Sequence, residues 1–276
     1  MSGLVFATIV PHGHHAIPEA CPPEEQALSA ATQEAMAEIG RRFVAARPDV
    51  SIVLTPHNIH VEGHMAVIMA GKVTGDLSMW AEGHFALTCP TDRDLGRAAI
   101  DALNAAGIPT VGISYGGNDQ PTAVAPMDWG VLIPLWFMGG RGEPQIPTVV
   151  ISPARDLSRE DHIRAGAALA AAAAASGKRV ALIASCDHGH GHQASGPYGF
   201  DPASAEYDDQ IVELVKANRL SALAQMDPAF PVQAKADSYW QMLMLNGAIG
   251  DTWRADFLSY AHPTYFGMLC ASFSPT

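Results

Sequence analysis

The most constraining stretch of this chain is an apolar run, residues 180–184, that ends in a histidine-rich loop. The run is short, aliphatic and free of charge, which is typical of a fully buried strand. Asp187, His188, His190 and His192 follow it, with single glycines between the imidazoles of 188, 190 and 192. In α/β proteins a buried strand commonly delivers polar side chains to a loop at one edge of the sheet. The stretch therefore predicts an α/β fold with a functional site just beyond this strand.

Two other apolar runs have the same layout. Residues 4–10 lead into Pro11-His12, and residues 50–54 lead into Thr55-Pro56-His57. Helical segments separate the apolar runs, so we expect one α/β domain over residues 1–276. Its central mixed sheet would be flanked by helices, with the active site at strand ends. We also expect strands over 65–70, 110–115, 147–152 and 264–273, helices over 22–46, 92–106, 127–138, 156–175, 201–218 and 237–249, and an irregular excursion over 71–90.

The composition argues against several classes of function. Acidic residues outnumber basic ones by 28 to 16, the formal net charge is −12, and the basic residues form no cluster. This distribution argues against a nucleic-acid groove and against binding to an anionic membrane. The four cysteines include no Cys-x-x-Cys pair, which disfavours a disulfide framework or a cysteine-rich zinc site. The N-terminal apolar run is too short for a signal peptide or a membrane span, so we expect a cytoplasmic protein.

The histidines that follow the strands suggest a metal site. Non-haem Fe(II) enzymes that activate oxygen hold the metal with two imidazoles and one carboxylate and leave the opposite positions open. His12 and His57 offer the imidazoles, and Asp237 is a candidate carboxylate. His190 or His192 would then supply a separate base. The same three ligands are also suitable for zinc and hydrolysis, so the residues by themselves leave the metal open.

Taken together, these segments resemble the class III extradiol ring-cleavage dioxygenases of the LigB type, and the resemblance spans nearly the whole chain. Val-Pro-His12 is similar to that family's first iron-ligand motif and Leu-Thr-Pro-His57 to its second. Residues 184–190, Ala-Ser-Cys-Asp-His-Gly-His, resemble its Ser-Gly-Asp-Leu-Ser-His, whose last histidine is the catalytic acid/base. Residues 127–135 resemble its Asp-His-Gly…Pro-Leu segment, and residues 240–248 are similar to the helix that carries its glutamate ligand.

The resemblance implies Fe(II) bound by His12 and His57, with His190 as the acid/base. The matching C-terminal region offers Asp237 where the family usually has glutamate. Glu62 is an alternative third ligand.

Trp129 stands where several relatives have a second active-site histidine, which would leave a second acid/base role to His192 or His60. We expect His60, Trp129, Tyr198 and Asp187 on the substrate side of the site, with the Asp187 carboxylate orienting an imidazole.

The resemblance implies a catechol-type or aminophenol-type substrate, O₂ as co-substrate, a ring-opened semialdehyde as product, and a homo-oligomer. Two alternatives remain at this point. One is a zinc-dependent hydrolase on the same ligands, and the other is a binding protein that uses this fold without catalysis.

Overall fold

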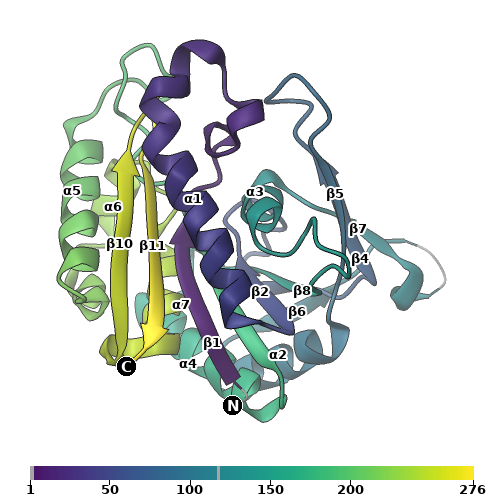
Figure 1. Ribbon diagram of the computed structural model, residues 1–276. Coiled ribbons are helices and arrows are strands. Elements are labelled where there is room, and N and C mark those ends of the chain that lie inside the picture. The colour runs from purple at the N-terminus through teal and green to yellow at the C-terminus, as the bar shows by residue number, and fades with distance from the viewer. Residues whose placement is uncertain (1–2, 117–118) are drawn as a thin grey trace.

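An eight-stranded mixed sheet forms the centre of the computed structural model, which describes residues 3–116 and 119–276 (Figure 1). Its strand order is β10-β11-β1-β9-β2-β8-β3-β6. This confirms the expected α/β class with a central mixed sheet. The strands are β1 (Gly3–Val10), β2 (Val50–Leu54), β3 (Met65–Ile68), β6 (Thr110–Ile113), β8 (Thr148–Ser152), β9 (Arg179–Ser185), β10 (Trp253–Ala261) and β11 (Met268–Pro275).

Four adjacent strands at the middle of the sheet, β1, β9, β2 and β8, run parallel to one another. The two strands that directly flank them run the other way, since β11 pairs antiparallel with β1 and β3 with β8. The carboxyl ends of β1, β9 and β2 therefore lie side by side at one edge of the sheet. In open α/β sheets this edge is where ligands bind.

Side chains alternate between two buried faces of the sheet, and helices cover both. On one face Val53, Ile183 and Cys270 pack against α1 (Gln26–Ala46) and α3 (Trp129–Phe137), which lie in front of the strands in Figure 1. On the other face Ile52 and Leu182 pack among residues of the remaining long helices. These helices are α2 (Arg93–Ala105), α4 (Arg159–Ala175), α5 (Pro202–Lys216) and α7 (Tyr239–Ile249); a short helix, α6 (Ala229–Gln233), precedes α7.

Three expectations about the strands need correction. The segment 71–90, expected to be irregular, contains β4 (Lys72–Asp76) and β5 (Ala86–Pro90), which form a second, three-stranded sheet with β7 (Val124–Pro126). Only Val73 of β4 is buried, so this strand lacks the apolar run that marks the central strands. The closing strand begins at residue 268 rather than 264, and β10 was missed. Because β10 lies at the edge of the sheet, its apolar residues alternate with Arg254 and Asp256 instead of forming a continuous run.

No helix within residues 3–116 and 119–276 combines the length and hydropathy that a bilayer crossing requires.

Helices α4 and α7 cross with their backbones almost in contact, and two glycines permit it. A Cβ atom added to Gly166 would lie 1.8 Å from the carbonyl oxygen of Met244, and one added to Gly247 would lie 1.9 Å from that of Ile163. Backbone atoms cannot yield as a flexible side chain would, so any side chain here must separate the helices. The crossing thus holds α7, and the segment just before it, against the rest of the fold.

We expect the substitution Gly166→Ala to destabilise the protein by about 1–3 kcal/mol, the usual cost of overpacking. Alanine has the higher helix propensity, so the loss must come from the displaced α7 and not from α4 itself. Urea unfolding followed by circular dichroism measures the change. Ala167→Ser, on the exposed side of the same turn, is the matched control and should stay within about 0.5 kcal/mol. A neutral or stabilising effect of Gly166→Ala would contradict the close crossing.

Candidate metal centre

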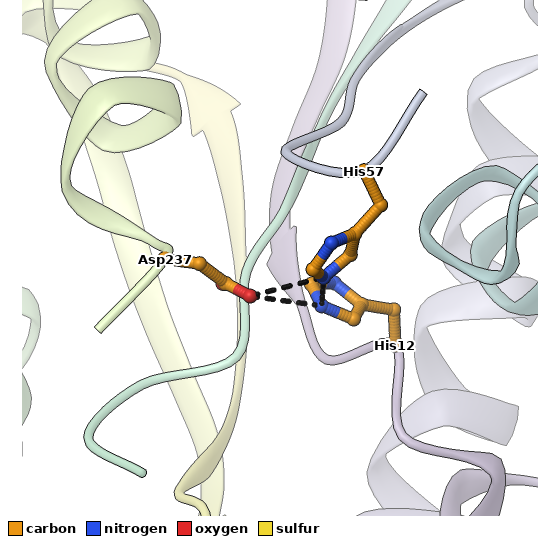
Figure 2. Close-up of side chains that lie close together, drawn as sticks. All are labelled: His12, His57 and Asp237. Carbon is orange, nitrogen blue, oxygen red and sulfur yellow. Dashed lines mark hydrogen bonds and ion pairs between the residues drawn. The ribbon is translucent and has the colours of Figure 1, made fainter. Parts of the chain in front are cut away.

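His12, His57 and Asp237 point toward one another beyond the carboxyl ends of the central strands (Figure 2). The Nε2 atoms of the two imidazoles are 3.1 Å apart. The Oδ2 atom of Asp237 lies 3.4 Å from Nε2 of His12 and 3.1 Å from Nε2 of His57. The structure therefore brings together the three residues predicted as metal ligands from positions far apart in the chain.

The spacing of these three atoms fits one divalent metal ion. Two ligands at right angles lie about 3 Å apart when each bond to the metal is about 2.1 Å long. All three separations are close to this value. Two neutral nitrogens and one carboxylate oxygen on one side of a metal form the set found in non-haem Fe(II) sites, and the set is also suitable for zinc.

Hydrogen bonds to the surroundings set which atom of each ligand faces the metal position. Ser185 donates to the carbonyl oxygen of Gly130 at 2.5 Å, so its oxygen is left to accept from Nδ1–H of His12, 3.0 Å away. Nε2 of His12 then carries the lone pair. Asp237 accepts the backbone N–H of Asp187 on Oδ1 at 3.1 Å, which leaves Oδ2 for the metal. Such bonds fix tautomer and orientation in metalloproteins.

The His57 turn is held by Asp128, the residue that caps α3. Asp128 accepts from the Thr55 hydroxyl at 2.9 Å, from the Asn58 amide at 2.8 Å and from the backbone N–H of Val131 at 3.2 Å. The Thr55 oxygen in turn accepts the backbone N–H of His57 at 3.3 Å. One partly buried carboxylate thus joins the end of β2 to the start of α3.

The buried site favours positive charge. Burial by itself lowers the pKa of His12, but the carboxylates of Asp187 and Asp237 outweigh it and raise that pKa to about 9. Burial likewise disfavours the charged form of Asp237, yet His12 and His57 hold the pKa of Asp237 well below its ordinary value. Asp187 also accepts the backbone N–H of His12 at 2.9 Å. A proton or a metal cation therefore belongs among these groups.

Metal affinity should rise with pH. His12 carries a proton below about pH 9 in the metal-free protein, and a metal must displace that proton to bind Nε2. Between roughly pH 6.5 and 9 the apparent association constant should increase by up to about tenfold per pH unit, because each binding event releases one proton. Calorimetric titration with Co(II), a redox-stable probe, in buffers of different ionisation enthalpy measures both the association constant and the number of protons released. A pH-independent constant with no proton release would contradict the protonated state of His12.

The metal position opens into a cavity of about 550 Å³. His190 lines this cavity without being one of the three ligands, and its ring stacks on Phe266 with centroids 5.6 Å apart. Its Nδ1 atom is buried and has no hydrogen-bond partner among the described residues. His190 also contributes to holding the pKa of Asp237 below its ordinary value.

The other predicted residues fall into two groups. Asp187, Trp129 and Tyr198 line the cavity, and Trp129 stacks on His57 with centroids 4.4 Å apart. His60 and Glu62 are exposed and are not among the described residues that line the cavity or form the three-residue cluster. The carboxylate beside the two imidazoles is therefore that of Asp237 and not that of Glu62.

His192 lies apart from the cavity lining within the described chain. Its Nε2 atom is 2.9 Å from Oδ2 of Asp208, and its side chain is almost fully buried. The imidazole is thus engaged by a carboxylate from α5, which speaks against the predicted acid/base role.

Asp208 is the main residue that the sequence analysis missed. It also accepts the backbone N–H of Gly189 at 2.7 Å and the hydroxyl of Tyr260 at 2.6 Å. These bonds fix the loop that carries His190. A signal was present, because Ser204, Asp208 and Ile211 share one face of α5, and a charged residue on an apolar helix face calls for a buried partner.

Comparison with known proteins agrees with this geometry. The chain matches the family described as the catalytic LigB subunit of aromatic ring-opening dioxygenase over residues 6–270. The Clostridium acetobutylicum protein CA_C1420 is 21% identical to it over 253 residues, which are 91% of this chain and 53% of that protein. The chain thus spans about half the length of this curated relative.

Among solved structures, the uncharacterized protein JW3007 from Escherichia coli K12 has a similar fold. The TM-score is 0.61 at 18% sequence identity, and the match covers 97% of this chain and 99% of that one. At this identity the likeness establishes the fold alone. The family match includes both Pro-His turns, the histidine-rich loop and Asp237, so the chain belongs to the LigB family of aromatic ring-opening dioxygenase catalytic subunits.

Proposed function

We propose that this protein is a non-haem Fe(II)-dependent extradiol dioxygenase that opens a catechol-type or aminophenol-type ring. The observation that carries the proposal is the convergence of His12, His57 and Asp237 beside a cavity that His12, His57 and His190 line. Three protein ligands leave positions for substrate and O₂, and His190 is free to exchange protons.

When bound by these ligands, Fe(II) would supply Lewis acidity toward the diol and a redox centre for O₂. His190 would accept a hydroxyl proton from the diol and return it later in the reaction. Imidazole suits this task because its ordinary pKa lies near neutrality. The ring packs against Phe266, and the bond that the Gly189 backbone N–H donates to Asp208 anchors the loop beside it.

The overall reaction balances without another reductant. A ring carbon–carbon bond beside the diol breaks, one oxygen atom of O₂ ends in a carboxylic acid, and the other ends in an aldehyde. The electrons that reduce O₂ come from the ring. The proton taken up by His190 returns to the product, so the residue ends as it began.

Anaerobic reconstitution with Fe(II), followed by oxygen-uptake assays over catechols, aminophenols and dihydroxypyridines, tests the proposal. We expect stoichiometric oxygen consumption and a yellow ring-opened product. Metal analysis of protein purified without oxygen should find iron. Bound zinc together with hydrolysis of ester or amide substrates would favour a hydrolase on the same ligands, and protein that takes up no metal would favour a binding role.

We also propose a homo-oligomer, which the family resemblance supports, and a cytoplasmic location. Sedimentation of the purified protein checks the first point and cell fractionation the second.

A further inference from the structure

Two aromatic walls extend from the metal position to the mouth of the cavity. In the first wall, the ring of His57 stacks on Trp129 with centroids 4.4 Å apart. The ring centroids of Trp129 and Trp80 are 5.3 Å apart. Trp80 is 44% exposed and lines the cavity, so this wall begins at a metal ligand and ends at solvent.

The second wall begins at His190. The centroid of its ring lies 5.6 Å from that of Phe266 and 5.7 Å from that of Tyr198. The ring of Tyr265 lies beside both, with its centroid 5.0 Å from that of Phe266 and 6.1 Å from that of Tyr198. Tyr198 is 57% exposed and also lines the cavity. The second wall therefore also runs from the reaction centre to solvent.

The size of the cavity exceeds the needs of one small ring. Its volume of about 550 Å³ falls within the range of roughly 300–1,000 Å³ that holds drug-sized ligands. A single diol ring at the metal position would leave much of this volume unfilled, including the part that Trp80 and Tyr198 line. Aromatic side chains that face such a space gain most from contact with another flat apolar group.

The charge of the cavity disfavours an anionic substituent. Its lining, all within the described chain, includes the carboxylates of Glu25 and Asp187 but neither lysine nor arginine. Glu25 already has a partner, since it lies 2.5 Å from Nε2 of His15. A carboxylate on the substrate would enter without the guanidinium partner that usually binds such a group.

We propose that the substrate is an uncharged ortho-diol that carries a second aromatic ring. This inference rests on the proposed function. The diol ring occupies the inner end of the cavity between His57 and His190, and the second ring lies between Trp80 and Tyr198 at the mouth. Trp80 and Tyr198 are then specificity-determining residues that take no part in the chemistry.

Binding measured without oxygen tests the inference separately from turnover. Calorimetry of the Fe(II)-loaded protein would compare 2,3-dihydroxybiphenyl, catechol and 3,4-dihydroxybenzoate. We expect the biphenyl diol to bind at least about tenfold more tightly than catechol, and the benzoate to bind most weakly. Trp80→Ala and Tyr198→Ala should each weaken binding of the biphenyl diol by roughly three- to tenfold, the value of an aromatic pair, and weaken catechol binding by less.

Met79→Ala is the matched control, because Met79 is next to Trp80, is 84% exposed, and is not among the described residues that line the cavity. It should leave all three affinities unchanged. Equal affinities for the biphenyl diol and catechol, or tightest binding of the benzoate, would overturn the inference even if ring cleavage is observed. Selective binding of the biphenyl diol without ring cleavage would support the inference and count against the dioxygenase.

Discussion

Asp237→Ala is expected to abolish stoichiometric metal binding, with a loss of affinity greater than the 10- to 100-fold that follows removal of a residue that merely supports a ligand. The carboxylate supplies one of three converging atoms and the negative charge that balances the cation. Without it, His12 and His57 remain as two imidazoles with their Nε2 atoms 3.1 Å apart, a weaker site for any divalent ion. Metal content after anaerobic reconstitution and calorimetry with Co(II) measure the effect.

Glu62→Ala is the control that makes this test decisive. Glu62 is the other carboxylate that the sequence offers as a third ligand, it is close to His57 in the chain, and it is exposed. We expect this variant to bind metal as the unmodified protein does. The opposite pattern, with metal lost in Glu62→Ala and kept in Asp237→Ala, would show that the metal is bound elsewhere.

His190→Ala is expected to retain its metal and to lose turnover by about 10²- to 10⁴-fold, the usual contribution of a general acid/base. The residue lines the cavity but is outside the three-residue cluster, so its removal leaves the ligand atoms in place. Oxygen uptake with the best substrate measures the rate, and metal analysis of the same preparation measures retention.

His60→Ala is the matched control for His190→Ala, because it also removes a histidine. His60 follows the His57 turn but is exposed and absent from the described cavity lining, so turnover should persist. Loss of metal in His190→Ala would make that residue a ligand. Full activity of His190→Ala would show that His190 takes no part in the reaction.

The Pro-His turns could be predicted because each follows a buried, continuously apolar strand, and parallel strands place their carboxyl ends together. This rule is enough to predict that His12 and His57 lie close together. Asp237 was harder, because it precedes a helix and no strand leads to it. The residues offer Asp237 only as a candidate carboxylate, and in the matching region the family usually has glutamate.

The remaining features depend on contacts that a linear pattern does not record. His192 and His190 look equivalent in the sequence, but docking of α5 brings Asp208 to the first and leaves the second facing the cavity. Likewise β4 and β10 lie at positions where one side of the strand is exposed, so their side chains follow no continuous apolar run. Pairing partners, and not local propensity, decide these elements.

The clamp that Asp187 forms between His12 and Asp237 has a consequence for the order of events in synthesis. Its carboxylate accepts the backbone N–H of His12, and its own N–H donates to the carboxylate of Asp237, which is synthesised 180 residues after His57. A nascent chain on the ribosome therefore has two imidazoles long before it has a complete site. Under the proposed function, a metal ion therefore finds its three ligands together only after the segment that carries Asp237 has been made.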